Sequence, residues 1–496
     1  MTEIGLAVLV SASGVGVLAP LQGRLPRWAL VSLAFPAGAG TYSIMGLGLL
    51  LTLGTVHVVA ALALTVAAGA AGSVVAHVRT SLGWESLFVL GLVVVGTAVV
   101  AAIAWTQHLT RLTPDSIRYL LVSSDIRLPS GLSEIHPDDL LKRQIGLPIL
   151  QTLAELGPRR YLAFVSPMFA ASAVGFFVWL ASHMLRGVPR RLRWSLVAAA
   201  TLFVLSTNRF VYNAFYINTH MMMAFFMLVA IAGIWLAIEE SQPVWGIVAG
   251  WALALTLLFR PESPIITALI LVPFAATAAP MRLRWRAVGP VMAVFAAWYV
   301  GGLWIHAPGG WDRGPVAPVL GNSVVVLAVV ALALVGGSDR GSRWARLADR
   351  ALLPAMVVLL ATLLAINPRI GFESVGATIR NLAPDWTWQY FTGAGGLWLF
   401  SWPVILILLA TALIVGRDRA ARPWRVPIVG FGILFFILPY LRGSAYRVGF
   451  GDSGSRMATH IVLVVMAYVL LAASQTITSR RQSRPDRRPA VSLEPG

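Results

Sequence analysis

Apolar runs long enough to cross a bilayer as a helix, about 18 residues or more, recur along the whole chain. Hydrophobic residues make up 58% of the 496 residues and charged residues 12%, and a soluble protein of this length could not bury that much apolar surface. A membrane β-barrel would show short alternating segments instead. The sequence therefore predicts an all-α fold, a polytopic transmembrane helical bundle.

Hydropathy and length predict about fifteen transmembrane helices. They lie near residues 4–21, 29–51, 56–76, 86–106, 161–185, 194–210, 219–238, 243–260, 264–279, 287–306, 317–337, 352–366, 397–415, 425–440 and 457–475. Two of these segments, 194–210 and 264–279, are short for a span and could be tilted, broken or partly re-entrant.

The net charge of +18 lies mainly in short loops between the apolar runs. Taken in alternation along the chain, one set of loops carries arginine in every member but "EESQP", which assigns that set to the cytoplasm by the positive-inside rule. The odd number of helices then places the N-terminus outside and the C-terminus inside. We expect a multi-pass protein of the cell (plasma) membrane whose basic loops contact anionic membrane lipid, with no nucleic-acid partner.

The composition divides the chain into three parts. We assign residues 1–84 to an N-terminal transmembrane appendage, 85–475 to a transmembrane core, and 476–496 to a basic cytoplasmic tail that we expect to be disordered. The first helices of the appendage are rich in Gly, Ala and Val, which predicts that they pack through small residues.

Three of the outer loops, 107–160, 367–396 and 441–456, hold many of the acidic groups that are not beside cytoplasmic arginines. Loops of such length in a helical membrane protein indicate ordered functional structure. Nucleotides are absent outside the cytoplasm, so an enzyme on that side needs a lipid-carried or otherwise pre-activated substrate. In the second loop, the segment "PDWTWQYF" (384–391) predicts an interfacial aromatic belt.

The first outer loop contains "RLTPDSIRYLLVSSDIRL" (111–128), just after an apolar run. Thr113 as N-cap, Pro114 at the first position and Asp115 in the first turn form a helix-start pattern. The apolar side of that helix predicts a position in the membrane interface, and a second interfacial helix is expected over 138–157. Asp115 either begins a surface helix or is the acid or base of an enzyme.

Ionisable residues also recur where other helices meet the outer face. Arg260 and Glu262 in "LFRPESP" predict either a structural ion pair or a phosphate-binding site, because ionisable groups at membrane level tend to be functional. His220 begins a helix in "YINTHMMMAFF", either as a polar cap or as a functional residue. The glycine-rich stretch 442–456 could bring backbone N–H groups to a phosphate or anchor lipid headgroups. Its candidate residues are Arg442, Tyr446, Arg447, Asp452 and Arg456.

Motifs for other kinds of chemistry are missing from the sequence. The chain has no cysteine, and no cluster of His and acidic residues has the spacing of metal ligands. A Walker motif, a nucleophile elbow and a dinucleotide fingerprint are also lacking. We therefore predict neither a metal nor a cofactor.

The order of four motifs resembles the GT-C superfamily of membrane glycosyltransferases. These are Asp115 and Tyr119 as D-x-x-x-Y, "IGLPIL" (145–150), "LFRPESP" (258–264) and "GSRMATHIVLV" (454–464), and the resemblance covers roughly residues 86–475. It implies a polyprenyl-phosphate sugar donor and an aspartate that acts as base on the acceptor hydroxyl. Many members carry two adjacent acids, whereas Ser116 follows Asp115 here, so a metal-dependent version is not expected.

The predicted function is inverting transfer of a sugar from a polyprenyl-phosphate donor to an extracytoplasmic cell-envelope acceptor, which is a glycan, a glycolipid or a protein. Asp115 would be the general base, and arginines would hold the phosphate as negative charge develops on the leaving group. The residues expected to bind substrate are Tyr119, His220, Arg260, Glu262, Arg442, Tyr446, Arg447 and Arg456. The alternatives are a lipid or solute transporter, for which internal repeats and mid-membrane charges are expected, and a non-catalytic scaffold.

Overall fold

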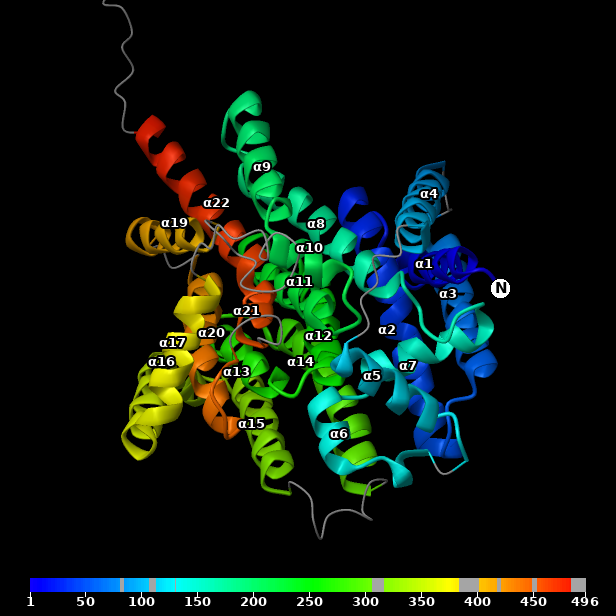
Figure 1. The fold of residues 1–496 in the computed structure, drawn as a ribbon. Coiled ribbons are helices and arrows are strands. Elements are labelled where there is room, and N and C mark those ends of the chain that lie inside the picture. Colours follow the sequence, from blue (N-terminus) through cyan, green and yellow to red (C-terminus); the bar gives the residue numbers. More distant parts are fainter. Residues whose placement is uncertain are drawn as a thin grey trace, which may run out of the picture.

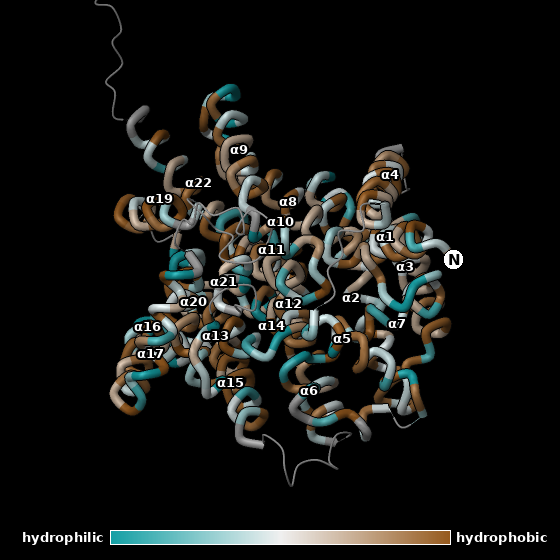
Figure 2. The backbone as a smooth tube through the Cα atoms, viewed as in Figure 1, coloured by the Kyte–Doolittle hydropathy of each residue, from teal (hydrophilic) through white to brown (hydrophobic). Residues whose placement is uncertain are grey.

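The computed structural model describes residues 1–80, 84–106, 113–129, 131–305, 316–382, 401–416, 421–447 and 453–482. Within these ranges the protein is a bundle of helices without a β-strand (Figure 1). Eleven of the described helices are long and apolar enough to span a membrane, and three shorter apolar helices accompany them. Hydrophobic residues, drawn brown in Figure 2, run along the helices, as expected for a membrane-embedded protein.

Four long helices begin the chain, with a short 3-10 turn after the first. They are α1 (Glu3–Leu18), η1 (Ala19–Leu21), α2 (Arg27–Leu53), α3 (Val58–Thr80) and α4 (Trp84–Thr106). A Cβ at Gly14 would lie 1.8 Å from the carbonyl oxygen of Ala34, and one at Gly16 would lie 2.3 Å from that of Gly69. Helix α1 therefore touches α2 and α3 backbone to backbone, through the small residues that the sequence predicts.

The loop that the sequence predicts to be the first outer one forms five short helical elements. They are α5 (Pro114–Asp125), η2 (Gly131–Glu134), α6 (Pro137–Arg143), α7 (Gly146–Thr152) and η3 (Leu153–Leu156). The predicted start of α5 is confirmed: Thr113 has extended backbone angles and its side chain accepts from the N–H of Ser116. Ile117 and Leu121 are exposed on α5, as expected for a helix at an interface.

The prediction of one interfacial helix over 138–157 is wrong. Gln144 has a φ of 54°, in the left-handed region, and this separates α6 from α7. Every residue of α7 is buried. Gly146 makes this burial feasible, because a Cβ there would lie 2.8 Å from the carbonyl oxygen of Leu258. The hydrophobic side of the segment therefore packs into the protein, not onto lipid.

The remaining helices complete the bundle. They are α8 (Val165–Met184), α9 (Arg190–Leu205), α10 (Asn208–Ala214), α11 (His220–Glu239), α12 (Pro243–Phe259), α13 (Ser263–Ala275), α14 (Met281–Phe295), η4 (Ala296–Ile305), α15 (Val316–Val335), α16 (Asp339–Ile366), α17 (Pro368–Leu382), α19 (Ser401–Val415), α20 (Arg422–Leu441), α21 (Ser453–Met457) and α22 (Thr459–Gln482). Helix α11 is apolar on all sides and packs against α8, α12 and α22. A helix of that kind belongs at the centre of a bundle.

Each of the fifteen predicted apolar segments overlaps a helix, but their number as membrane spans stays a prediction. Helix α9 has 16 residues and begins with two arginines, and it is not among the eleven described spans. Two boundaries differ from the prediction. Helix α16 begins at Asp339, inside an expected basic loop, because the Ser338 side chain caps it. Residues 476–482 continue α22, where we expected a disordered tail.

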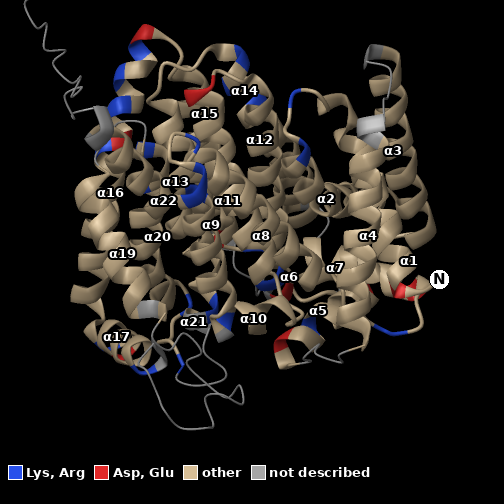
Figure 3. Ribbon diagram, turned by 90° about the horizontal axis from the view of Figure 1, so that it is seen from above, with Lys and Arg blue, Asp and Glu red and all other residues tan. Residues whose placement is uncertain are grey.

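Charged residues gather at two opposite edges of the bundle (Figure 3). Arginines gather at the edge where α14 and α16 begin. The opposite edge holds α5, α6, α10, α17 and α21. The aromatic segment 384–391, Asp452 and residues 483–496 lie outside the described residues.

Candidate functional site

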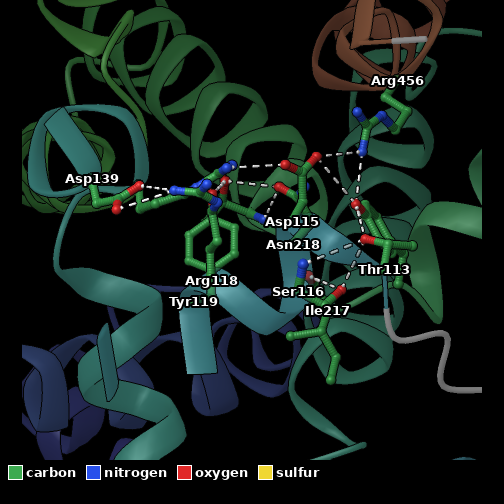
Figure 4. A network of polar contacts seen from close by, with 12 residues as sticks. Thr113, Asp115, Ser116, Arg118, Tyr119, Asp139, Ile217, Asn218 and Arg456 are labelled. Atoms are coloured by element: carbon green, nitrogen blue, oxygen red, sulfur yellow. Dashed lines mark hydrogen bonds and ion pairs between the residues drawn. The ribbon is translucent and has the colours of Figure 1, made fainter. Parts of the chain in front are cut away.

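Asp115 lies between two arginines that are far apart in the sequence (Figure 4). Its Oδ1 is 3.0 Å from Nη2 of Arg143, the last residue of α6. Its Oδ2 is 3.2 Å from Nη1 of Arg456, in α21. The Asp115 side chain is 34% exposed, so this ion-paired carboxylate sits where the protein meets its surroundings.

Tyr216 completes the surroundings of Asp115. Nη1 of Arg456 donates to the Tyr216 hydroxyl at 2.7 Å, and the same hydroxyl is 2.7 Å from Oγ1 of Thr113. The Ser116 hydroxyl donates to the carbonyl oxygen of Ile217 at 3.0 Å. These bonds join the first turn of α5 to the segment before α11, and so fix where the Asp115 carboxylate points.

The charge state of Asp115 follows from its partners. Partial burial raises the pKa of this carboxyl, but the guanidiniums of Arg143 and Arg456 outweigh burial and hold the pKa below its ordinary value. Asp115 is therefore an anion at neutral pH. At that pH the carboxylate takes up a proton in two cases only. The proton comes from a group that reacts beside it, or Arg143 and Arg456 have first formed ion pairs with another anion.

A second ion pair lies deeper, between α12 and α13. Nη2 of Arg260 is 2.8 Å from Oε1 of Glu262, and Nε donates to the same oxygen at 2.8 Å. The Glu262 side chain is only 1% exposed. Burial raises the pKa of Glu262, but the Arg260 charge, aided by His460 and Arg442, holds it below its ordinary value. The sequence predicted either a structural ion pair or a phosphate-binding site at these two residues, and the structure contains the ion pair.

A buried histidine pair adjoins this ion pair. Nδ1 of His220 is 2.8 Å from Nε2 of His460, so the first turn of α11 meets the first turn of α22. Nearby, Nδ2 of Asn213 donates to Oγ1 of Thr459 at 2.6 Å. The charges of Arg260 and Arg456 both act on His220, which places the outer and inner ion pairs in one electrostatic unit.

Five arginines and two carboxylates make up this unit within the described residues. We call the five the arginine cluster: Arg143, Arg209, Arg260, Arg442 and Arg456. It extends from the surface, where Arg442 is exposed, to the interior, where Arg209 is 1% exposed. Positive charge in such excess favours an anion as its ligand, and the planar guanidinium suits phosphate oxygens.

The other predicted residues differ in where they lie. Tyr119 is buried and joins the two ion pairs, since Arg143 lies 5.4 Å from the centre of its ring and its hydroxyl interacts with Arg260. The Tyr446 hydroxyl instead donates to the carbonyl oxygen of Phe435, which anchors the segment before α21. Arg447 is exposed on the surface.

Sequence reasoning missed four members of the site: Arg143, Arg209, Tyr216 and His460. His460 and Arg209 carried a usable signal, because an ionisable residue beside an apolar run at membrane level is a functional candidate. Arg143 and Tyr216 carried none, since their positions depend on the break at Gln144 and on the path of the chain before α11. Within the described residues, no three His, Asp or Glu side chains come together as a metal site.

An apolar pocket of about 490 Å³ adjoins the cluster, between α17, α19, α20 and α22. Its lining includes Ile405, Leu409, Phe431, Phe435 and Ala458. The Phe431 ring lies 6.1 Å from that of His460, and Ala458 follows Met457, whose sulfur is 3.6 Å from Nη2 of Arg442. The pocket therefore approaches the arginine cluster through His460 and Met457, and no arginine of the cluster is among its lining residues.

Comparisons with models of known protein families, with curated proteins and with solved structures find no match to this chain.

Proposed function

We propose that the protein is a membrane glycosyltransferase of GT-C type, which moves a sugar from a polyprenyl-phosphate donor to a glycan, glycolipid or protein acceptor. One observation carries the proposal: an apolar pocket lies one side chain away from a partly buried arginine cluster, two members of which hold the carboxylate of Asp115. A polyprenyl phosphate has these two parts in the same order, an apolar chain and an anionic head.

The donor fits the site in one orientation. The polyprenyl chain occupies the pocket lined by Phe431 and Phe435, and its phosphate reaches the arginines beside it. The sugar then extends toward Asp115, at the exposed end of the cluster. This arrangement leaves the acceptor to approach from outside the bundle.

The reaction is a single displacement at the sugar. The acceptor hydroxyl oxygen attacks the anomeric carbon, and the bond from that carbon to the phosphate oxygen breaks. The electron pair of that bond leaves with the polyprenyl phosphate, where the arginines stabilise the developing charge. The acceptor proton passes to a carboxylate oxygen of Asp115 as general base.

The ion pairs of Asp115 have a role in this scheme. Asp115 holds Arg143 and Arg456 in place when no phosphate is present. A donor phosphate competes for both guanidiniums, which weakens their hold on the carboxylate. The pKa of Asp115 then rises toward its ordinary value, so donor binding makes Asp115 a better base.

We place the site on the extracytoplasmic side of the cell membrane. The support is that the basic starts of α14 and α16, which the positive-inside rule assigns to the cytoplasm, lie at the edge opposite the site (Figure 3). This orientation leaves the N-terminus outside and the C-terminus in the cytoplasm.

The test is transfer by the purified protein in vesicles, with a panel of polyprenyl-phosphate hexoses and pentoses and release of polyprenyl phosphate as the readout. We expect Asp115→Asn to slow release by about 100-fold or more, because the general base is lost. Asp139→Asn is the matched control. Asp139 is also an ion-paired carboxylate of the first outer loop, 3.0 Å from Arg118, and its loss should leave the rate within about threefold of wild type.

Binding of polyprenyl phosphate to Asp115→Asn shows that the variant is folded. Transfer by Asp115→Asn at nearly the wild-type rate would remove Asp115 from the mechanism. Movement of labelled lipid across the vesicle membrane, with no sugar released from any donor, would favour the transporter instead.

A further inference from the structure

A second apolar cavity lies between the N-terminal helices and the core, and no arginine of the cluster is among its lining residues. It is a groove of about 310 Å³ between α1, η1, α2, α11 and α12. Leu21, Leu33, Met45, Phe226, Trp251 and Leu255 are among its lining residues. Its lining hydroxyl, that of Thr41, already donates to the carbonyl oxygen of Ala37. A molecule in the groove therefore needs no polar group to form hydrogen bonds with the lining.

Three arginines gather at one end of this groove. Helix α14, which carries Arg282 and Arg286, packs closely on α12 next to this lining. A Cβ at Gly246, beside Ile247, would be 2.4 Å from Cδ1 of Leu283, and one at Gly250 would be 2.6 Å from the Arg286 carbonyl oxygen. Arg24 follows Leu21 on the η1 side, and the charges of Arg24 and Arg282 both act on Arg286. The end of the groove is thus flanked by positive charge from both of its walls.

Exposed tryptophans indicate how deep this end of the groove lies in the membrane. Trp28 at the start of α2 is 61% exposed and Trp285 at the start of α14 is 55% exposed. Exposed tryptophans at helix ends sit at the level of lipid headgroups. The three arginines therefore lie where the phosphates of one leaflet lie, at the edge opposite the candidate site.

The length of the groove matches one leaflet. It follows α2 from Leu33 to Met45, which is about 18 Å at the rise of an α-helix. Half the hydrocarbon core of a bilayer is about 15 Å. A single acyl chain that starts at the arginine end would fill the groove to the middle of the membrane.

We propose that the groove binds one acyl chain of an anionic glycerophospholipid, whose phosphate is held by Arg24, Arg282 and Arg286. The lipid comes from the leaflet at the arginine-rich edge. It packs between the N-terminal helices and the core, and so ties α2 to α12. This role is separate from the proposed transfer reaction and does not depend on it.

The test is lipid retention by the purified full-length protein, measured by native mass spectrometry with phosphatidylglycerol and phosphatidylcholine as probes. We expect wild type to retain phosphatidylglycerol in preference. The triple variant Arg24→Gln, Arg282→Gln, Arg286→Gln should bind it roughly 100-fold more weakly, since each arginine near a membrane surface contributes. Ala37→Phe, which fills the groove, should lose retention with all three arginines present.

A second triple variant is the matched control: Arg340→Gln, Arg343→Gln, Arg346→Gln. It removes the same charge from an exposed stretch of α16 at the same edge, and it should retain phosphatidylglycerol as wild type does. Thr41→Phe is a second groove-filling variant in case Ala37→Phe fails to fold. Equal loss in both triple variants, or full retention in a folded groove-filling variant, would overturn the proposal. No sugar donor enters this experiment, so its failure leaves the transferase proposal untouched.

Discussion

Asp115 is held by guanidiniums from two distant parts of the chain, since Arg143 ends α6 and Arg456 belongs to α21, just before the last helix. The carboxylate therefore links two segments that lie far apart in the sequence. In the proposed binding mode, the same two arginines are the cluster members closest to the donor sugar. Their geometry determines both the charge of Asp115 and the affinity for phosphate.

Arg456→Lys tests the phosphate role of that residue. A lysine keeps the charge but loses the planar fork that binds two oxygens, so we expect KM for the lipid donor to rise by about 10- to 100-fold. Steady-state kinetics over donor concentration measure the change. Arg118→Lys, which alters an exposed pair with Asp139, should leave KM unchanged. A wild-type KM in Arg456→Lys contradicts the assignment.

The low pKa of Asp115 predicts how its ion pairs respond to acid. Because the folded pKa lies below the unfolded value of about 3.9, the pairs stabilise the protein at pH values above that figure. This stabilisation is lost as the pH falls through the folded pKa. The difference in Tm between wild type and Asp115→Asn should stay constant from about pH 7 to 5 and shrink below about pH 4. A difference that already shrinks at pH 6 would mean that the pKa is raised.

Sequence reasoning identified individual residues of the site better than their contacts. Asp115, Tyr119, His220, Arg260, Glu262, Arg442 and Arg456 were named from motifs and membrane-level charge, and the structure brings them into one unit. Their pairing could not be predicted. The partner of His220 is 240 residues away in the chain, and no periodicity encodes such a distance.

At the scale of helices, Arg284 joins three elements. It is fully buried in α14, and its guanidinium donates to the carbonyl oxygens of Ala275, Thr277, Ala279 and Ala333. These oxygens lie at the ends of α13 and α15, where helices leave carbonyl groups unsatisfied. A cation at that position also suits the negative end of a helix dipole.

Arg284→Gln should therefore lower the free energy of unfolding by about 3 kcal/mol, because several carbonyl groups lose a charged donor. Thermal unfolding in detergent measures the effect. Arg343→Gln, at an exposed position on α16, should change stability by less than about 0.5 kcal/mol. Equal stability of the two variants would show that the Arg284 hydrogen bonds are replaced by water.

Two elements show where pattern reasoning succeeds and where it fails. The start of α5 followed from local chemistry, because an N-cap threonine and a first-turn proline act within one helical turn. The second helix of the same loop was mispredicted. Its amphipathic pattern was read correctly, but the pattern is the same whether its apolar side meets lipid or another helix. Only the close approach of Gly146 to Leu258 decides between them.

Over the whole molecule, the two edges carry different groups of residues. One carries the arginine-rich helix starts and the exposed tryptophans. The other carries the arginine cluster with its carboxylates. Composition alone predicted the helical membrane class. The exact number of spans could not follow from it, because short helices such as α9 and α13 have lengths that fit a span, a tilt or a buried segment equally.

The absence of cysteine from the chain allows a clean test of orientation. We introduce a single cysteine at an exposed position of each edge, Ser444→Cys beside the cluster and Arg343→Cys on α16. A maleimide that cannot cross membranes should label Ser444→Cys in intact cells and Arg343→Cys only after lysis. The reverse pattern would place the site in the cytoplasm and would contradict the proposed orientation.

The arginine cluster has a consequence for the pace of the proposed reaction. Guanidiniums stay charged at any physiological pH. The strength of their attraction to a ligand therefore depends on the charge of that ligand. The donor is a phosphodiester with one negative charge, whereas the polyprenyl phosphate left behind is a monoester of charge about −1.5 to −2 at pH 7. Under the proposed mechanism, we therefore expect the site to bind its spent product more tightly than its substrate. Turnover would then be governed by how quickly the used carrier leaves for the surrounding membrane, and a neighbouring enzyme that removes that carrier would set the speed of this one.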